Sequence, residues 1–108
     1  MANEYQSCID ACYQCAEACD RCAVSSLQEP HLEMMRACIK ADMECAALCR
    51  VTAQLLSLES EQAKQVCRIC ADACRACAEE CSKHQHDHCQ QCAAECRRCA
   101  EVCMQMAA

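Results

Sequence analysis

Cysteines recur along this 108-residue chain at alternating steps of three and four positions. The segment CRICADACRACAEEC, at 67–81, places five of them within fifteen residues. Steps of three and four put side chains on one stripe of an α-helix, where leucine normally sits in a helix–helix seam. The spacing therefore predicts helices that present a row of thiols to their neighbours.

A repeated pattern supports this interpretation. The motif CxxCAxxCxxCA occurs three times, at 12–23, 67–78 and 89–100. The chain has no glycine and 20 alanines, and this composition favours helix almost throughout.

We expect four helices joined by short connections, in a single domain that spans 1–108. Their expected ranges are about 3–25, 30–58, 60–83 and 87–106. Short connections make successive helices antiparallel neighbours. The predicted fold is all-α, an antiparallel up-down-up-down four-helix bundle with a cysteine-lined core.

Local signals mark three of the helix starts. Asn3 is expected to cap the first helix, with Gln6 completing a capping box. Pro30 suits the first turn of the second helix. Asp87 is expected to cap the fourth helix, with Gln90 three residues later as its partner.

The seams contain all 18 cysteines. The first helix contributes Cys8, Cys12, Cys15, Cys19 and Cys22, the second Cys38, Cys45 and Cys49, the third Cys67, Cys70, Cys74, Cys77 and Cys81, and the fourth Cys89, Cys92, Cys96, Cys99 and Cys103. Charged residues flank the seams and are expected to face solvent: Asp10, Glu17, Arg75, Glu79 and Arg97. The seams must then face one another.

Composition bears on both the core and the compartment. Leu, Ile and Val together number only 13, and the net charge is −6, so cysteine must hold the core. The acidic balance argues against a nucleic-acid partner, and no apolar run approaches a membrane span. The N-terminal MANEYQSCIDAC lacks the features of a signal peptide. A cytoplasmic location is expected, where thiols stay reduced.

Three interpretations of the thiols fit poorly. Cysteines acting only as small hydrophobes would leave the bundle underpacked. A disulfide ladder conflicts with a reducing compartment, and closely spaced thiols offer many competing partners. The ferredoxin spacing of iron–sulfur proteins is absent from the sequence.

Two metal-binding interpretations remain. Zinc or cadmium storage is suggested by six CxxC pairs, but many tetrahedral sites are hard to satisfy together in a rigid core. Cu(I) fits better, because it is soft and selects thiolate. It accepts two or three sulfurs, and each thiolate can bridge two ions, so about one ion per cysteine is expected. One Cu⁺ per thiolate also leaves the core neutral.

The CxxxCxxCxxxCxxC spacing of the first helix and its counterparts resembles the bacterial copper storage proteins, in particular their cytosolic branch. The resemblance covers essentially the whole chain. It implies a four-helix bundle that fills its core with many Cu(I) ions and assembles as a homotetramer. The expected function is storage and detoxification of copper. We expect no enzyme, because no catalytic arrangement stands apart from the thiols.

Because successive helices run antiparallel, the other residues are expected to gather at one end of the bundle or the other. One end gathers Cys22, Ser26, Cys81 and Cys89 with the candidate accessory residues His31, Met34, Met35, His84, His86 and His88. The opposite end gathers an expected apolar plug of Tyr5, Val51, Leu55, Leu56, Leu58, Met104 and Met106. The hypothesis is that Cu(I) enters at the His/Met end. The alternative is a polar loop with methionines that fill gaps.

Asp42 occupies a seam position of the second helix where a cysteine is expected. A buried carboxylate needs a partner. Asp42 can ligate copper weakly, accept a hydrogen bond from a thiol, or turn to the bundle edge, and the edge position is the expectation.

Overall fold

The computed structural model describes residues 2–108, with side chains from Tyr5 onward. Over this range it contains four α-helices and no strand: α1 (Ala2–Ser26), α2 (Leu32–Ser57), α3 (Ala63–Ser82) and α4 (Asp87–Ala107). They form an elongated bundle of 45 × 18 × 18 Å. α1 and α3 each pack against both α2 and α4. The predicted four-helix bundle is confirmed.

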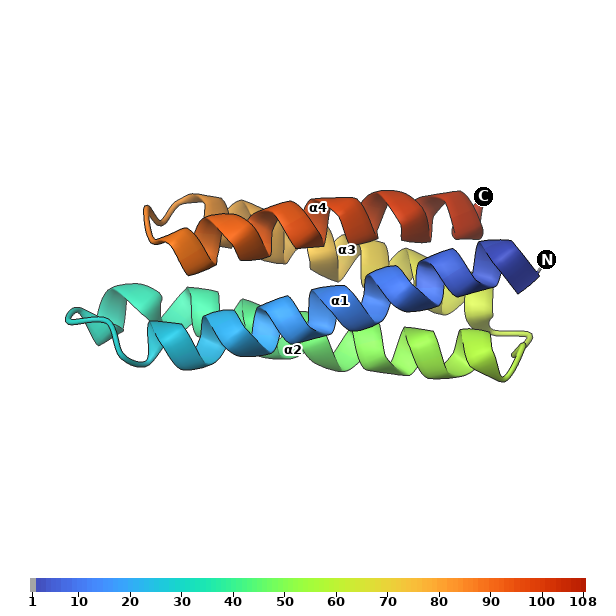
Figure 1. Ribbon diagram of the computed structural model, residues 1–108, viewed down its shortest axis with the longest axis horizontal. Helices are drawn as coiled ribbons and strands as arrows, with labels where there is room; N and C mark the ends of the chain where they lie inside the picture. The colour runs from blue at the N-terminus through green and yellow to red at the C-terminus, as the bar shows by residue number, and fades with distance from the viewer. Residues whose placement is uncertain (1) are drawn as a thin grey trace.

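The connections alternate between the two ends of the bundle (Figure 1). The α1–α2 and α3–α4 connections lie at one end, and the α2–α3 connection lies at the other end with both termini. None of the helices described is long and apolar enough to cross a membrane.

Two helices begin later than expected. Hydrogen bonds from Gln28 N to Ser25 O and from Glu29 N to Ser26 O continue the turns beyond α1, so the chain reverses through Pro30. His31 is consequently the N-cap residue of α2, and the start at Pro30 is wrong. α3 begins at Ala63 rather than near residue 60, because the turn that ends α2 continues to Ser60 and Gln62 is the N-cap residue of α3.

A glycine-free turn ends α2. Glu59 has a φ of 54°, in the left-handed region. The amide of Ser60 donates to Leu55 O at 2.9 Å, and that of Glu59 to Leu56 O at 3.0 Å. These two bonds make a Schellman motif, which usually has glycine at the position of Glu59.

N-terminal caps were predicted at Asn3 and Asp87, and the structure tests the second of them. His86 is the N-cap residue of α4, and no side chain caps that end. The side-chain amide of Gln90 donates instead to His84 O at 2.6 Å, so the expected capping box of Asp87 and Gln90 is wrong. The expected Asn3 cap lies outside the residues whose side chains the structure describes.

The core is a column of sulfur. All 18 cysteine side chains have 0% exposure, and the other buried apolar residues are mainly alanines beside the seams. The flanking charges are exposed as predicted, at Asp10, Glu17, Arg75, Glu79 and Arg97. The buried alanines let the helices approach closely, so the small cysteine side chains can touch across the bundle.

The apolar plug is smaller than expected. Leu56 is buried, Leu55 is partly buried, and Tyr5 and Met106 pack against the core from partly exposed positions. Val51, Leu58 and Met104 are exposed, because they lie on the outer faces of their segments.

Candidate metal centre

The thiols of four helices form one continuous network. Neighbouring sulfurs lie between 3.4 Å (Cys38 to Cys81) and 4.0 Å (Cys45 to Cys49) apart. A disulfide requires about 2.05 Å, and all 18 cysteines are free thiols. The network is therefore reduced, and its sulfurs are in van der Waals contact.

Groups of four ligand atoms lie within 4.8 Å of one another throughout the core. Five such groups are Cys12–Cys70–Cys99–Cys103, Cys15–Cys49–Cys74–Cys99, Cys15–Cys19–Cys45–Cys96, Cys19–Cys77–Cys92–Cys96 and Cys22–Asp42–Cys81–Cys92. Each shares at least one sulfur with the next. A single sulfur can therefore bridge ions held in neighbouring groups, as soft-metal thiolate clusters require.

Asp42 lies inside this network, so the expected edge position is wrong. Its side chain is fully buried. The thiols of Cys77, Cys92 and Cys81 donate hydrogen bonds to Oδ1 at 3.2, 3.3 and 3.4 Å. Burial raises the pKa of Asp42 to about 11. A protonated carboxyl with thiol donors explains how the side chain is tolerated there.

The thiols nearest the His/Met end differ in acidity. Hydrogen bonds from Cys38 and Cys81, with a further one from His88, lower the pKa of Cys22 to about 5. Burial raises the pKa of Cys89 to about 12. Cys22 is therefore a thiolate at neutral pH and a ready ligand for a soft cation.

An axial cavity of about 370 Å³ opens at the His/Met end. Its lining is Glu29, Pro30, His31, Met34, Met35, Lys83, His84, Gln85 and His86. Five of the six predicted accessory residues thus meet here. Met34 is 68% exposed, whereas Met35 is buried.

The sixth residue, His88, lies against the core sulfurs. Its Nδ1 is 3.3 Å from Cys22 Sγ and 3.5 Å from Cys89 Sγ, and its Nε2 is 2.8 Å from Glu29 Oε2. The His86 ring stacks on it at 5.4 Å and also contacts Glu29. Burial acts to lower the pKa of His88, but hydrogen bonds to Cys22 and Glu29 outweigh burial and raise it.

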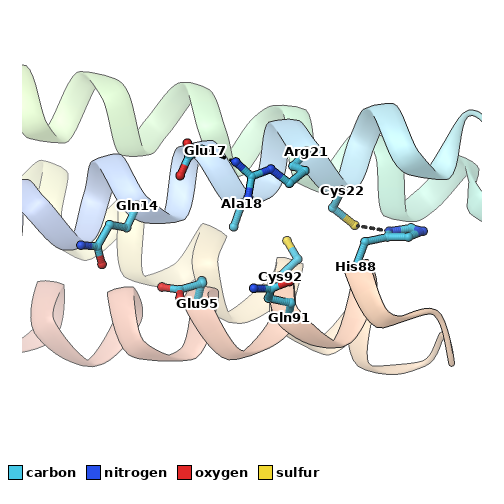
Figure 2. A pocket seen from close by; sticks show the side chains of 9 residues that line it. All are labelled: Gln14, Glu17, Ala18, Arg21, Cys22, His88, Gln91, Cys92 and Glu95. Atoms are coloured by element: carbon cyan, nitrogen blue, oxygen red, sulfur yellow. Dashed lines mark hydrogen bonds and ion pairs between the residues drawn. The ribbon is translucent and has the colours of Figure 1, made fainter.

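A lateral groove of about 140 Å³ runs between α1 and α4 (Figure 2). Its lining is Gln14, Glu17, Ala18, Arg21, Cys22, His88, Gln91, Cys92 and Glu95. Sequence reasoning missed this groove. Its polar residues are flank positions of the repeats, and nothing in their spacing distinguishes them from other solvent-facing positions.

The copper storage protein profile matches residues 1–108. The chain belongs to the copper storage protein family. It is 44% identical over 88 residues to the uncharacterized cysteine-rich protein YhjQ of Bacillus subtilis, a match that covers 82% of each chain.

Solved structures of the family have the same fold. The Cu(I)-bound copper storage protein BsCsp3 superposes with a TM-score of 0.93 at 43% identity, covering 97% of this chain and 99% of the other. A cytosolic copper storage protein of Streptomyces lividans with five coppers gives 0.94 at 37% identity, covering 97% and 92%. The family match agrees with the resemblance carried by the cysteine spacing.

Proposed function

We propose that this protein stores multiple Cu(I) ions in its bundle core, with all 18 cysteines as ligands. The observation that carries the proposal is the overlap of the four-ligand groups along the bundle. Sharing of sulfurs lets the number of ions approach the number of thiols. The whole of 1–108 acts as one storage unit.

Charge favours Cu(I) over the second candidate, Zn²⁺. One Cu⁺ for each thiolate leaves the core neutral. A Zn²⁺ held by four thiolates leaves two negative charges at each buried site, which costs free energy in a low-dielectric interior. A fully reduced network of fully buried sulfurs therefore suits the monovalent ion.

Cu(I) enters through the axial cavity in this proposal. The thioethers of Met34 and Met35 and the imidazoles of His31, His84 and His86 bind Cu(I) transiently, since they are weaker ligands than thiolate.

His88 then passes the ion to Cys22, which is already a thiolate. Asp42 completes the group with Cys22, Cys81 and Cys92 once it loses its proton.

The proposed location and oligomeric state are based on the family. The Streptomyces lividans relative is described as cytosolic, and we place this protein in the cytosol as well. We propose a homotetramer on the resemblance to the family. Its role is copper sequestration rather than catalysis, because the overlapping four-ligand groups are suited to holding metal ions.

Anaerobic titration of the reduced protein with Cu(I), in the presence of a competing chelator, tests the proposal. We expect about one tightly held ion per cysteine, and weaker binding of Zn(II) in a parallel titration. Saturation at a few ions, or a preference for Zn(II), would contradict Cu(I) storage. A mass of the isolated protein that is about 2 Da low for each bridge would support the disulfide-bearing alternative instead.

A further inference from the structure

The lateral groove reaches the sulfur core from the side of the bundle. Cys22 and Cys92 lie in its lining together with His88. No cysteine is among the residues that line the axial cavity in the described part of the chain. Cys22 and Cys92 also belong to one four-ligand group with Asp42 and Cys81. An ion in that group therefore lies behind the floor of the lateral groove.

Groups of opposite charge flank this floor (Figure 2). Arg21 and Glu17 stand on α1, with Arg21 Nη2 3.2 Å from Glu17 Oε2. A guanidinium has five N–H donors, so Arg21 retains donors for a second carboxylate. Glu95 stands on α4, where its partly exposed carboxylate lies 3.8 Å from Arg98 Nη1 and keeps lone pairs for an ammonium group.

The chemistry of the floor restricts what can exchange copper there. Only a soft ligand competes with thiolates for Cu(I), and a thiolate is the closest match. The groove has a volume of about 140 Å³, which suits a molecule of amino-acid size rather than a protein loop. The flanking charges match a molecule that carries both a carboxylate and an ammonium group.

We propose that the lateral groove binds a small zwitterionic thiol, of the chemical class of free cysteine, and that Cu(I) passes there between the core and this thiol. The carboxylate pairs with Arg21, the ammonium group with Glu95, and the sulfur faces Cys22 and Cys92. This proposal rests on the proposed storage function and adds a second opening to it.

The exchange is a ligand substitution without a change of oxidation state. The sulfur of the incoming thiol forms a bond to Cu(I), and the bond between Cu(I) and Cys22 Sγ breaks. The incoming thiol attacks as its thiolate and Cys22 Sγ leaves as a thiolate, so the charges balance without a proton transfer. In the reverse direction, the same steps load the core from a thiol complex of Cu(I).

The experiment uses the copper-loaded full chain and an excess of a bulky, coloured Cu(I) chelator. The rate of copper transfer is measured with four thiols: cysteine, cysteamine, 3-mercaptopropionate and 2-mercaptoethanol. These carry both charged groups, the ammonium group alone, the carboxylate alone, and neither. They are compared at equal thiolate concentration, because the thiolate is the attacking species. We expect cysteine to be the fastest and to show saturation.

Two charge variants test the assigned contacts. Arg21→Gln should raise the half-saturating concentration of cysteine about threefold, as expected for one exposed ion pair. Glu95→Gln should do the same for cysteamine. Arg75→Gln removes an exposed arginine from α3 and should leave both values unchanged.

A steric variant tests the groove itself. Ala18→Leu fills the groove, and Ala73→Leu is its matched control, at the same position of the repeat and also partly buried. We expect Ala18→Leu to abolish the advantage of cysteine and Ala73→Leu to retain it.

Two results would overturn the proposal in different ways. If the rate of copper transfer from loaded wild-type protein follows only the intrinsic reactivity of the four thiols, and Ala18→Leu and Ala73→Leu behave alike, the groove does not bind the thiol. The proposed storage function is unaffected by that result. A wild-type protein that fails the prior Cu(I) titration contradicts storage and the groove together.

Discussion

Nδ1 of His88 lies 3.3 Å from the sulfur of Cys22. The opposite nitrogen of the same ring contacts Glu29 Oε2 at 2.8 Å. A carboxylate that accepts a hydrogen bond from one imidazole nitrogen orients the other nitrogen toward a metal. The structure therefore places a preoriented nitrogen ligand beside the most acidic thiol at the His/Met end.

Replacing His88 with alanine should slow capture of the first Cu(I) equivalent roughly tenfold, because the oriented nitrogen ligand is lost. Total capacity should remain that of the wild type. Stopped-flow absorption of the copper–thiolate bands measures this rate. Gln85→Ala is the control, because Gln85 lines the same axial cavity but offers no ligand for Cu(I) in the proposed entry route. Equal loading rates in both variants would exclude a role for His88 in capture.

Asp42 should make the metal-free protein less stable as the pH rises. Its folded-state pKa, about 11, is raised above the ordinary value of an unfolded aspartate, 3.8. The folded state therefore holds a proton that the unfolded state releases, so stability is full below about pH 4 and declines as the pH rises toward 11. The slope contributed by one such proton is at most about 1.4 kcal/mol per pH unit.

Asp42→Asn removes this titration but retains a carbonyl acceptor for Cys77, Cys81 and Cys92. Urea unfolding at pH 5 to 7, under reducing conditions, should give a flatter pH profile for the variant than for the wild type. Parallel profiles for the two proteins would show that Asp42 does not hold its proton in the folded state.

The sequence predicted the bundle and its sulfur core because one signal governs both. Residues spaced alternately three and four positions apart lie on one face of a helix. Cys15, Cys19 and Cys22 have this spacing, and all three are buried as it predicted. The predicted start of α2 at Pro30 is wrong because hydrogen-bonded turns at Gln28 and Glu29 follow α1, and His31 is the N-cap residue of α2.

Sequence patterns could not predict the burial of Asp42 or the presence of the lateral groove. The edge position assigned to Asp42 assumed an ionised carboxylate, whereas burial among the thiols of α3 and α4 favours the protonated form. The groove depends on which flank residues of α1 and α4 meet, such as Arg21 and Glu95, and this follows from helix packing.

Glu59→Gly should stabilise the metal-free protein by about 1 kcal/mol. Glu59 has a φ of 54°, where a Cβ atom is strained and glycine is not. The change in the free energy of unfolding can be measured with urea. Glu61→Gly is the control, since Glu61 has no positive φ and should gain nothing. A loss of stability in Glu59→Gly would mean that its side chain makes a contact worth more than the strain.

Loading should release protons, because Cu(I) binds thiolates and most core thiols are buried and neutral. At neutral pH the first equivalent should release less than one proton, because the pKa of Cys22 is about 5 and this thiol is already ionised. Later equivalents should release about one proton each, so their apparent affinity should rise about tenfold per pH unit. A pH indicator in weakly buffered solution, read during an anaerobic titration, measures the release. A constant release of one proton from the first equivalent onward would show that copper does not begin at Cys22.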